Sequence, residues 1–257
     1  MTELSASDLV VRRGDRMVLQ DVTLRAGAGE FVAVIGANGA GKSTLLAAMA
    51  GMLGADSGRI HLDARPLSGY RASELARRRA YLPQNPHCEW PISVERLVAL
   101  GLTPSLPVFG GWNSSDQKKI DDVLASCDLL EHREQAATTL SGGELARAML
   151  ARAFVGDPDI LIVDEPVTGL DPSHALDCIR RLKAFAQAGK LVVASLHDLT
   201  LAARYASRIV ALKNGKIESD GLPECVLTAS LIRKIFDTEA IVLRGAGGLY
   251  VDFIEGG

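Results

Sequence analysis

Two stretches of this chain carry residue types that suit phosphate chemistry, and the first is glycine-rich. It reads Gly-Ala-Asn-Gly-Ala-Gly-Lys-Ser over residues 36–43 and follows the apolar, β-branched run at 31–35. Glycines let backbone N–H groups turn toward phosphate oxygens, and a helix that follows adds the positive end of its dipole. Lys42 can then reach the β- and γ-phosphates, and the Ser43 hydroxyl can ligate Mg²⁺. The spacing predicts a strand, a phosphate-binding loop and a helix beginning near Gly41.

The second stretch is an acidic pair that could supply the groups needed for hydrolysis. Asp164 and Glu165 directly follow the apolar run at 160–163, so we expect them at the exit of a buried strand. Parallel packing puts that exit beside the phosphate loop. There Asp164 suits an outer-shell position on Mg²⁺, and Glu165 suits the orientation or deprotonation of a water molecule.

Two further polar residues gain meaning only from their surroundings. Gln84 follows a short strand-like run, and His197 closes the apolar run at 191–195. Either residue alone is typical of ordinary loop or structural chemistry. A strand end on a parallel sheet is also where a γ-phosphate would lie, which makes His197 a candidate for contact with it.

Composition narrows the class of protein. The chain has 257 residues, 47% of them hydrophobic, which suffices for one domain or a domain with a sizeable subdomain. Its net charge of −3 gives no basic excess that would favour nucleic acid. There is no apolar run near eighteen residues and no signal-peptide pattern, so we expect a cytosolic chain that reaches a membrane only through partners. The four cysteines lack C-x-x-C spacing, which favours reduced thiols.

The order of the predicted elements favours an α/β fold. Residues 7–35 are predicted as antiparallel β structure. Strand-like runs then alternate with helical patterns, which is typical of a largely parallel sheet; these runs are 160–163, 191–195 and 208–212. Residues 87–154 carry little β signal and are predicted as an inserted helical subdomain. We therefore expect one domain over 1–257, with an α/β core and β subdomain formed by 1–86 and 155–257.

A third motif, Leu140-Ser141-Gly142-Gly143-Glu144, stands between the phosphate loop and the acidic pair. Together the motifs resemble those of the ATP-binding cassette (ABC) superfamily, in the same order and over nearly the whole chain. On that pattern the motifs are the Walker A loop at 36–44, the Q-loop at Gln84, the signature motif at 140–144, the Walker B strand at 160–165, the D-loop at 168–171 and the switch histidine at His197.

The resemblance implies a P-loop NTPase (RecA-like) core with an antiparallel β subdomain and an inserted α-helical subdomain. It also implies an ATPase in which Ser141, Gly142 and Gly143 bind the γ-phosphate held by a second copy, so that two copies close head to tail around two MgATP. The implied catalytic residues are Glu165, His197 and Gln84. The implied nucleotide-binding residues are Arg13, Asn38, Gly39, Ala40, Gly41, Lys42, Ser43, Thr44, Ser141, Gly142, Gly143 and Asp171, and the implied Mg²⁺ ligands are Ser43, Gln84 and Asp164.

Three positions depart from the family pattern. Arg13, directly before Gly14, stands where the family usually has an aromatic residue that stacks on adenine. A guanidinium can stack on a base or point to water, and both options stay open. Glu144 replaces the commoner Gln, and Ala146 replaces the usual Gln, which leaves Arg147 without a polar neighbour.

Weaker signals indicate a subfamily, the ATPase subunits of bacterial importers for iron chelates, haem and cobalamin. They are the runs 90–94, 98–101, 172–174, 195–199, 202–206 and 226–228. This subfamily implies a homodimer on the cytoplasmic face of the inner membrane, a polytopic permease, an extracytoplasmic binding protein and no nucleic-acid partner. The alternatives are an importer of free zinc or manganese ions, an ABC clamp on DNA or ribosomes, and a nucleotide-sensing binding module.

The stretch from Pro86 to Gly111 is rich in proline, glycine and apolar residues. More apolar surface is expected here than a solitary enzyme leaves uncovered; the residues concerned are Trp90, Leu106, Val108, Phe109 and Trp112. In the family this insert and the Q-loop receive a cytoplasmic helix of the permease. The alternative is that these side chains fold into the core of their own subdomain.

Overall fold

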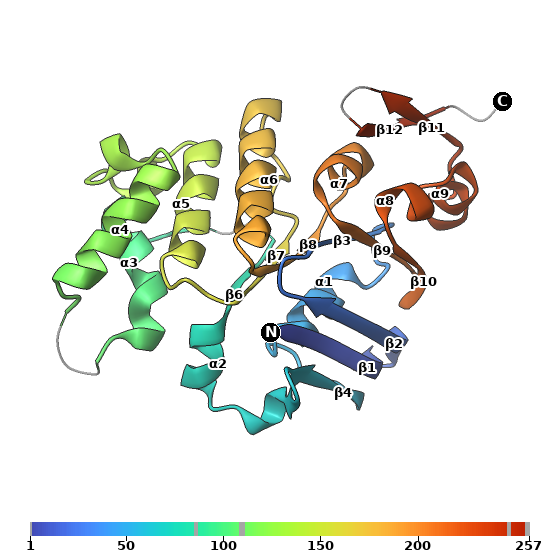
Figure 1. Cartoon of the computed structure of the whole chain (residues 1–257), viewed down its shortest axis with the longest axis horizontal. Coiled ribbons are helices and arrows are strands. Elements are labelled where there is room, and N and C mark those ends of the chain that lie inside the picture. The colour runs from blue at the N-terminus through green and yellow to red at the C-terminus, as the bar shows by residue number, and fades with distance from the viewer. Residues whose placement is uncertain (1, 85–86, 108–110, 246–247, 255–257) are drawn as a thin grey trace.

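A six-stranded sheet forms the centre of the computed structural model, which describes residues 2–84, 87–107, 111–245 and 248–254 (Figure 1). Its strand order is β10-β9-β3-β8-β7-β6. All neighbours are parallel except β10, which pairs antiparallel with β9. The strands are β3 (Phe31–Gly36), β6 (Arg79–Leu82), β7 (Ile160–Asp164), β8 (Leu191–Ser195), β9 (Arg208–Lys213) and β10 (Lys216–Gly221). The predicted parallel sheet is confirmed.

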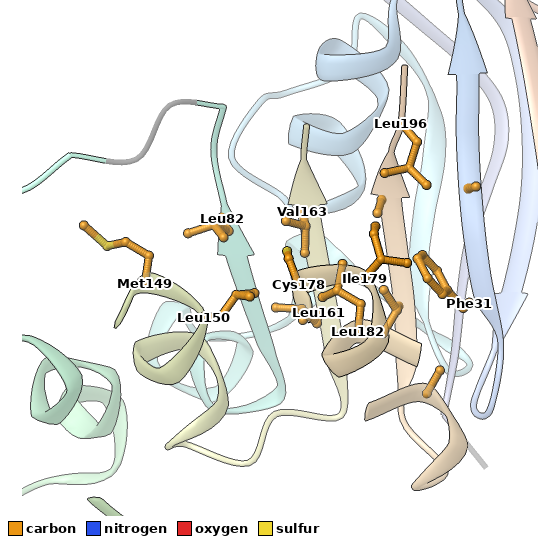
Figure 2. Packing of buried hydrophobic residues seen from close by; sticks show 14 of the residues in the cluster. Phe31, Leu82, Met149, Leu150, Leu161, Val163, Cys178, Ile179, Leu182 and Leu196 are labelled. Atoms are coloured by element: carbon orange, nitrogen blue, oxygen red, sulfur yellow. The ribbon is translucent and has the colours of Figure 1, made fainter. Parts of the chain in front are cut away.

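Both faces of this sheet are covered, which explains the uninterrupted apolar runs. Alternate residues of a strand point to opposite faces. Val32 and Val34 of β3 pack with α1 (Lys42–Met49), whereas Phe31 and Ala33 belong to the cluster with the helices of the other face. Figure 2 shows part of this second cluster, in which Phe31, Leu161 and Val163 lie beside Ile179 and Leu182 of α6 (Pro172–Gln187).

A smaller antiparallel sheet of order β2-β1-β4-β5 packs on the α1 side (Figure 1). It contains β1 (Glu3–Arg13), β2 (Arg16–Gly27), β4 (Ser57–Leu62) and β5 (Arg65–Pro66). The prediction for residues 7–35 was wrong in one respect, because the strand at 31–35 joins the parallel sheet. Segments 17–19 and 22–24 belong to one strand, β2, with Asp21 in the left-handed region at φ 52°.

The predicted helical insert contains α3 (Val94–Ala99), α4 (Ser114–Ser126) and α5 (Gly142–Phe154), joined by short 3-10 turns at Leu100–Ser105, Leu130–His132 and Ala137–Thr139. Figure 1 shows these helices together beyond β6, the edge strand of the central sheet. Within the described part of the insert, the β pairing is a single bridge between Ser93 and Ala136. The boundaries at 87 and 154 stay a prediction.

The three consecutive arginines at 77–79 have different surroundings. Arg77 and Arg78 end α2 (Ala72–Arg78), and Arg79 begins β6. Arg78 forms ion pairs with Asp63 and Asp159. Arg79 is half-buried, and this burial lowers the pKa of its guanidinium. Three arginines in a row could lie on a solvated helix face, but Arg78 and Arg79 do not, because the chain leaves the helix between them and turns into the sheet.

The chain ends in α7 (Leu199–Tyr205), α8 (Pro223–Val226), α9 (Ala229–Phe236) and a hairpin of β11 (Ala240–Gly245) and β12 (Gly248–Phe253). No helix among the described residues is both long and apolar enough to cross a membrane.

Candidate nucleotide-binding and hydrolysis site

A cleft of about 900 Å³ lies beside the phosphate loop, near the carboxyl ends of β3, β6, β7 and β8. Its lining residues are Arg13, Arg16, Val18, Asn38, Gly39, Gly41, Lys42, Ser43, Thr44, Gln84, Glu165, Thr168 and His197. Ten of them are residues that the sequence singled out. The loop, the acidic strand end and the two isolated polar residues therefore meet in one place.

The phosphate loop has a conformation that its glycines make possible. Gly41 has φ 107° and caps α1, and a Cβ there would lie 2.9 Å from Leu19 Cδ2. Close packing of the loop against β2 therefore excludes a side chain at Gly41. Ala40 is 5% exposed and does not line the cleft.

Lys42 is a cation held inside this loop. It is 5% exposed, and its Nζ donates to the carbonyl oxygens of Gly36 at 2.9 Å and Ala37 at 3.2 Å. Burial lowers the pKa of Lys42, while the carboxylates of Glu165 and Asp164 oppose that effect. Phosphate oxygens bound here would compensate the positive charge of this desolvated ammonium. The loop therefore fits a nucleotide phosphate.

Ser195 at the end of β8 fixes the acidic pair. Its Oγ donates to Asp164 Oδ1 at 2.6 Å and accepts from the Glu165 backbone N–H at 2.8 Å. Asp164 is 3% exposed and lies behind the cleft lining, whereas Ser43 is exposed at the cleft. This geometry suits an Asp that acts on Mg²⁺ through its outer shell and a Ser that ligates the ion directly.

Three polar side chains converge on the Glu165 carboxylate, two of them from distant parts of the chain. Gln84 Nε2 donates to Oε2 at 2.5 Å, and Thr168 Oγ1 donates to the same oxygen at 3.2 Å. His197 Nε2 lies 2.5 Å from Oε1 and, facing a carboxylate, donates to it. Glu165 has φ 50°, so the backbone turns sharply at the strand exit. A carboxylate so oriented can accept a proton from an attacking water.

The signature residues and Asp171 lie outside this cleft. Ser141 caps α5: its Oγ accepts from the Glu144 N–H at 3.3 Å, and its own N–H donates to Glu144 Oε2 at 2.8 Å. This capping box satisfies the start of the helix locally. Asp171 caps α6 by accepting from the Ser173 and His174 backbone N–H groups. The chain alone therefore does not bring Ser141, Gly142, Gly143 or Asp171 to the phosphate loop.

Sequence reasoning missed three residues of the site, namely Arg16, Val18 and Ser195, and it placed Thr168 in the D-loop without a role at the site. Arg16 pairs with Arg13 across the β1–β2 hairpin. The Gly14-Asp15 turn was visible in the sequence and was the signal that could have found Arg16. Ser195 gave no such signal, because its partners lie about thirty residues away on a neighbouring strand.

The described residues hold no group of three or more His, Cys, Asp or Glu side chains that could bind a metal ion. A Mg²⁺ ion here would consequently depend on the Ser43 hydroxyl and on nucleotide oxygens, with Gln84 and Asp164 nearby. That donor set of neutral and phosphate oxygens fits Mg²⁺, which keeps water ligands and binds phosphates readily.

Known proteins resemble this chain over most of its length. Residues 19–168 match the family model described as ABC transporter. The hemin import ATP-binding protein HmuV of Nocardia farcinica is 40% identical over 250 residues, with 93% of this chain and 84% of that one covered. The ferric enterobactin transport ATP-binding protein FepC of Escherichia coli is 34% identical, with 95% and 90% covered.

Solved structures share the fold. A chain of a metal-chelate type ABC transporter in an inward-facing conformation superimposes with a TM-score of 0.84 at 22% identity, covering 99% of this chain and 97% of that one. The dimeric post-hydrolysis cassette MJ0796 bound to ADP and Pi gives 0.76 at 25% identity, covering 86% and 98%. With the cleft, its convergent polar groups and these matches, the chain belongs to the ABC transporter family and is one of its ATPases.

Proposed function

We propose that this chain is the ATP-hydrolysing subunit of a bacterial importer for haem or another iron chelate, with cobalamin as a related cargo. The observation that carries the enzymatic part is the convergence of Gln84, Thr168 and His197 on Glu165 beside Lys42. The cargo class rests on the relatives named for hemin and ferric enterobactin import. The chain would lie peripherally on the cytoplasmic face of the inner membrane.

In this proposal the residues of the cleft divide the work of hydrolysis. The loop N–H groups and Lys42 would hold the β- and γ-phosphates, and Ser43 and Gln84 would hold Mg²⁺, with Asp164 acting through the outer shell of the ion. The ion would neutralise charge on the phosphate oxygens. Glu165 orients the attacking water and takes its proton, while His197 keeps that carboxylate turned toward the cleft.

A second copy would complete the site. Ser141 and Gly142 are exposed, and a Cβ at Gly142 would meet no atom within 4 Å. Such an open, glycine-containing helix start can accept the γ-phosphate bound by another copy. Two copies would then close head to tail around two MgATP, and hydrolysis would reopen them.

A groove between the core and the helical insert supports a membrane permease as the other partner. Two adjoining clefts of about 340 and 250 Å³ share Leu100 and Arg152 among their lining residues. Three exposed apolar side chains line them: Met52 at 63%, Trp90 at 69% and Leu100 at 48%. In the described part of the chain, Arg79 and Arg152 of this groove have no carboxylate partner. An amphipathic cytoplasmic helix of a permease would cover both features.

The loop residues expected at this surface differ in how far their side chains are exposed. Leu106 is partly buried against the main core, and Trp112 is 36% exposed with its Nε1 donating to Gln117 Oε1 at 2.8 Å. Val108 and Phe109 lie outside the described residues. Trp90 is therefore the residue of choice for testing the permease contact.

The test is co-expression with the permease encoded beside this chain, followed by affinity capture and ATPase assay in proteoliposomes. Wild-type chain should capture a polytopic membrane protein, and an extracytoplasmic binding protein loaded with hemin or a ferric siderophore should stimulate ATP turnover. Trp90→Glu should lose capture and stimulation while keeping basal turnover, whereas Trp112→Glu should behave as wild type. Stimulation by zinc- or manganese-loaded binding protein alone would overturn the cargo class. Recovery of DNA or ribosomes without a membrane protein would overturn the importer.

A further inference from the structure

The two glycines of the signature loop have different surroundings. Gly142 is exposed, and a Cβ there would meet nothing within 4 Å. Gly143 is buried, and a Cβ there would lie 2.7 Å from Cγ and Cδ2 of the His174 imidazole and 2.8 Å from its Nδ1. The start of α5 is therefore packed directly against a side chain at the start of α6.

The His174 ring is fixed by the D-loop aspartate. Its Nδ1 lies 2.5 Å from Asp171 Oδ2 and donates to it, and the His174 backbone N–H donates to Asp171 Oδ1 at 3.0 Å. Ser173 adds its backbone N–H at 2.9 Å and its Oγ at 3.0 Å to the same oxygen. These hydrogen bonds hold the pKa of the Asp171 carboxyl far below its usual range. Asp171 is thus an ionised anchor that sets the position of the ring.

We propose that His174 is a positioning residue that joins the D-loop to the signature loop. The two loops then keep a fixed relative position when they contact a second subunit. In this arrangement Gly143 is a glycine because the imidazole occupies the space of a side chain. Gly142 is a glycine because the other subunit's nucleotide needs that space. The inference rests on the proposed head-to-tail dimer, because that dimer is where the two loops would act.

The contact links two parts of the chain that also meet through apolar packing and through polar contacts such as the ion pair between Arg181 and Asp128. Gly143 belongs to the helical insert, and His174 and Asp171 belong to the core. The His174 ring packs against the buried Gly143 on one side and is hydrogen-bonded to Asp171 through Nδ1. A shift of the ring away from this position weakens the hydrogen bond to Asp171. Movement of the signature loop is consequently transmitted to the D-loop through His174.

The test uses ATP-driven dimer formation, measured by light scattering in the slowly hydrolysing Glu165→Gln background. His174→Ala should raise the ATP concentration needed for dimers by about five- to tenfold, the loss of roughly one hydrogen bond and its packing, while the ATP affinity of the monomer stays unchanged. His174→Asn keeps an N–H donor near Nδ1 and should recover part of the effect. Equal dimerisation of all three chains would overturn the proposal.

A double-mutant cycle tests the contact between His174 and Gly143 directly. Gly143→Ala must displace the imidazole, so it should weaken dimers as His174→Ala does, and the two changes together should be no worse than one. Gly142→Ala serves as the matched control, and its effect should add to that of His174→Ala. Additive effects of Gly143→Ala and His174→Ala would overturn the link.

The link can also be tested without dimers, by thermal unfolding of the nucleotide-free chain. Gly143→Ala should lower the unfolding temperature of the wild-type chain and should cost little once His174 is alanine; Gly142→Ala should be neutral in both chains. If the Glu165→Gln chain that keeps His174 forms no dimer with ATP, the proposed function is contradicted. In that case the unfolding cycle alone would decide whether His174 and Gly143 interact.

Discussion

The phosphate loop at 36–43 and the signature loop at 141–143 are both small-residue segments that lead into a helix. The phosphate loop lies at the carboxyl edge of the central sheet, where neighbouring strands deliver Glu165 and His197 to the same cleft. The signature loop lies on the helical insert, where no strand edge brings other groups. Its helix start is satisfied locally by the capping box, and Gly142 faces open space. Similar local sequence therefore lies among converging polar side chains in one place and is left open in the other.

The largest difference between the two regions should appear when one carboxylate in each becomes an amide. Glu165→Gln removes the proposed base and should lower ATP turnover by on the order of a hundredfold or more, with ATP binding retained and dimers accumulating. Glu144→Gln keeps the capping box, because an amide oxygen still accepts from the Ser141 N–H, and should leave turnover near wild type. Steady-state ATPase assays of both purified variants measure this. Near-normal turnover of Glu165→Gln would move the base elsewhere, with His197 the next candidate.

A mixed dimer tests whether the signature loop is half of a site in the other subunit. Ser141→Arg should abolish ATP-driven closure of its own homodimer without preventing ATP binding to the phosphate loop. Pairing a Ser141→Arg chain with a Lys42→Ala chain leaves one composite site with both halves intact and breaks both halves of the other. One nucleotide should then be trapped per dimer, about half of the wild-type amount, as counted with labelled ATP. Two damaged sites in the mixed dimer would contradict an arrangement in trans.

Ser195 tests how strongly the nucleotide cleft depends on contacts between strands. Ser195→Ala removes the hydroxyl that bonds both Asp164 and the Glu165 N–H, and it leaves Asp164 buried without that donor. Loss of a supporting contact of this kind should lower turnover by about tenfold. Ser207→Ala is the control, since its Oγ accepts from the Phe31 N–H at 2.9 Å at a distance from the cleft chemistry. Equal turnover of the two variants would show that Asp164 and Glu165 are held by the strands alone.

The smallest effect is expected at the hairpin that borders the cleft. If the Arg13 guanidinium stacks on adenine, Arg13→Ala should weaken ATP binding by roughly 1 kcal/mol, the scale of an exposed cation–π contact, and Arg13→Tyr should restore it. Arg12→Ala is the control, because Arg12 neighbours Arg13 without lining the cleft. Isothermal titration with ATP measures all three. Equal affinity of the alanine, tyrosine and wild-type chains would show that position 13 faces solvent.

A comparison of variants at Arg16 and Arg13 distinguishes recognition of the phosphates from recognition of the base. Its guanidinium nitrogen would lie 3.7 Å from a Cβ at Gly39, over the phosphate loop. Because this position is beside the phosphates, Arg16→Ala should weaken binding of ATP and GTP equally, whereas Arg13→Ala should change their ratio. The same titrations with GTP make the comparison.

Local pattern was sufficient for the elements that carry the chemistry. The apolar run at 31–35, the glycines after it and Lys42 predict strand, loop and helix, because each depends on neighbours in the chain. The acidic pair after 160–163 was predicted at a strand exit, where it lies. The antiparallel assignment of 31–35 failed, because strand partners are chosen by packing across the whole sheet.

The sequence by itself determined which segments have the pattern of phosphate-binding loops and which family they resemble, since motif spacing and apolar runs are local properties of a chain. Only the tertiary structure decided that Gln84 and His197 share the Glu165 carboxylate, and that Ser195 holds Asp164. Those contacts depend on the strand order β3-β8-β7-β6, which places residues up to 81 positions apart side by side. Likewise, the different surroundings of Gly142 and Gly143 follow from how α5 packs on α6, because hydrophobic packing sets which groups meet and the local pattern does not.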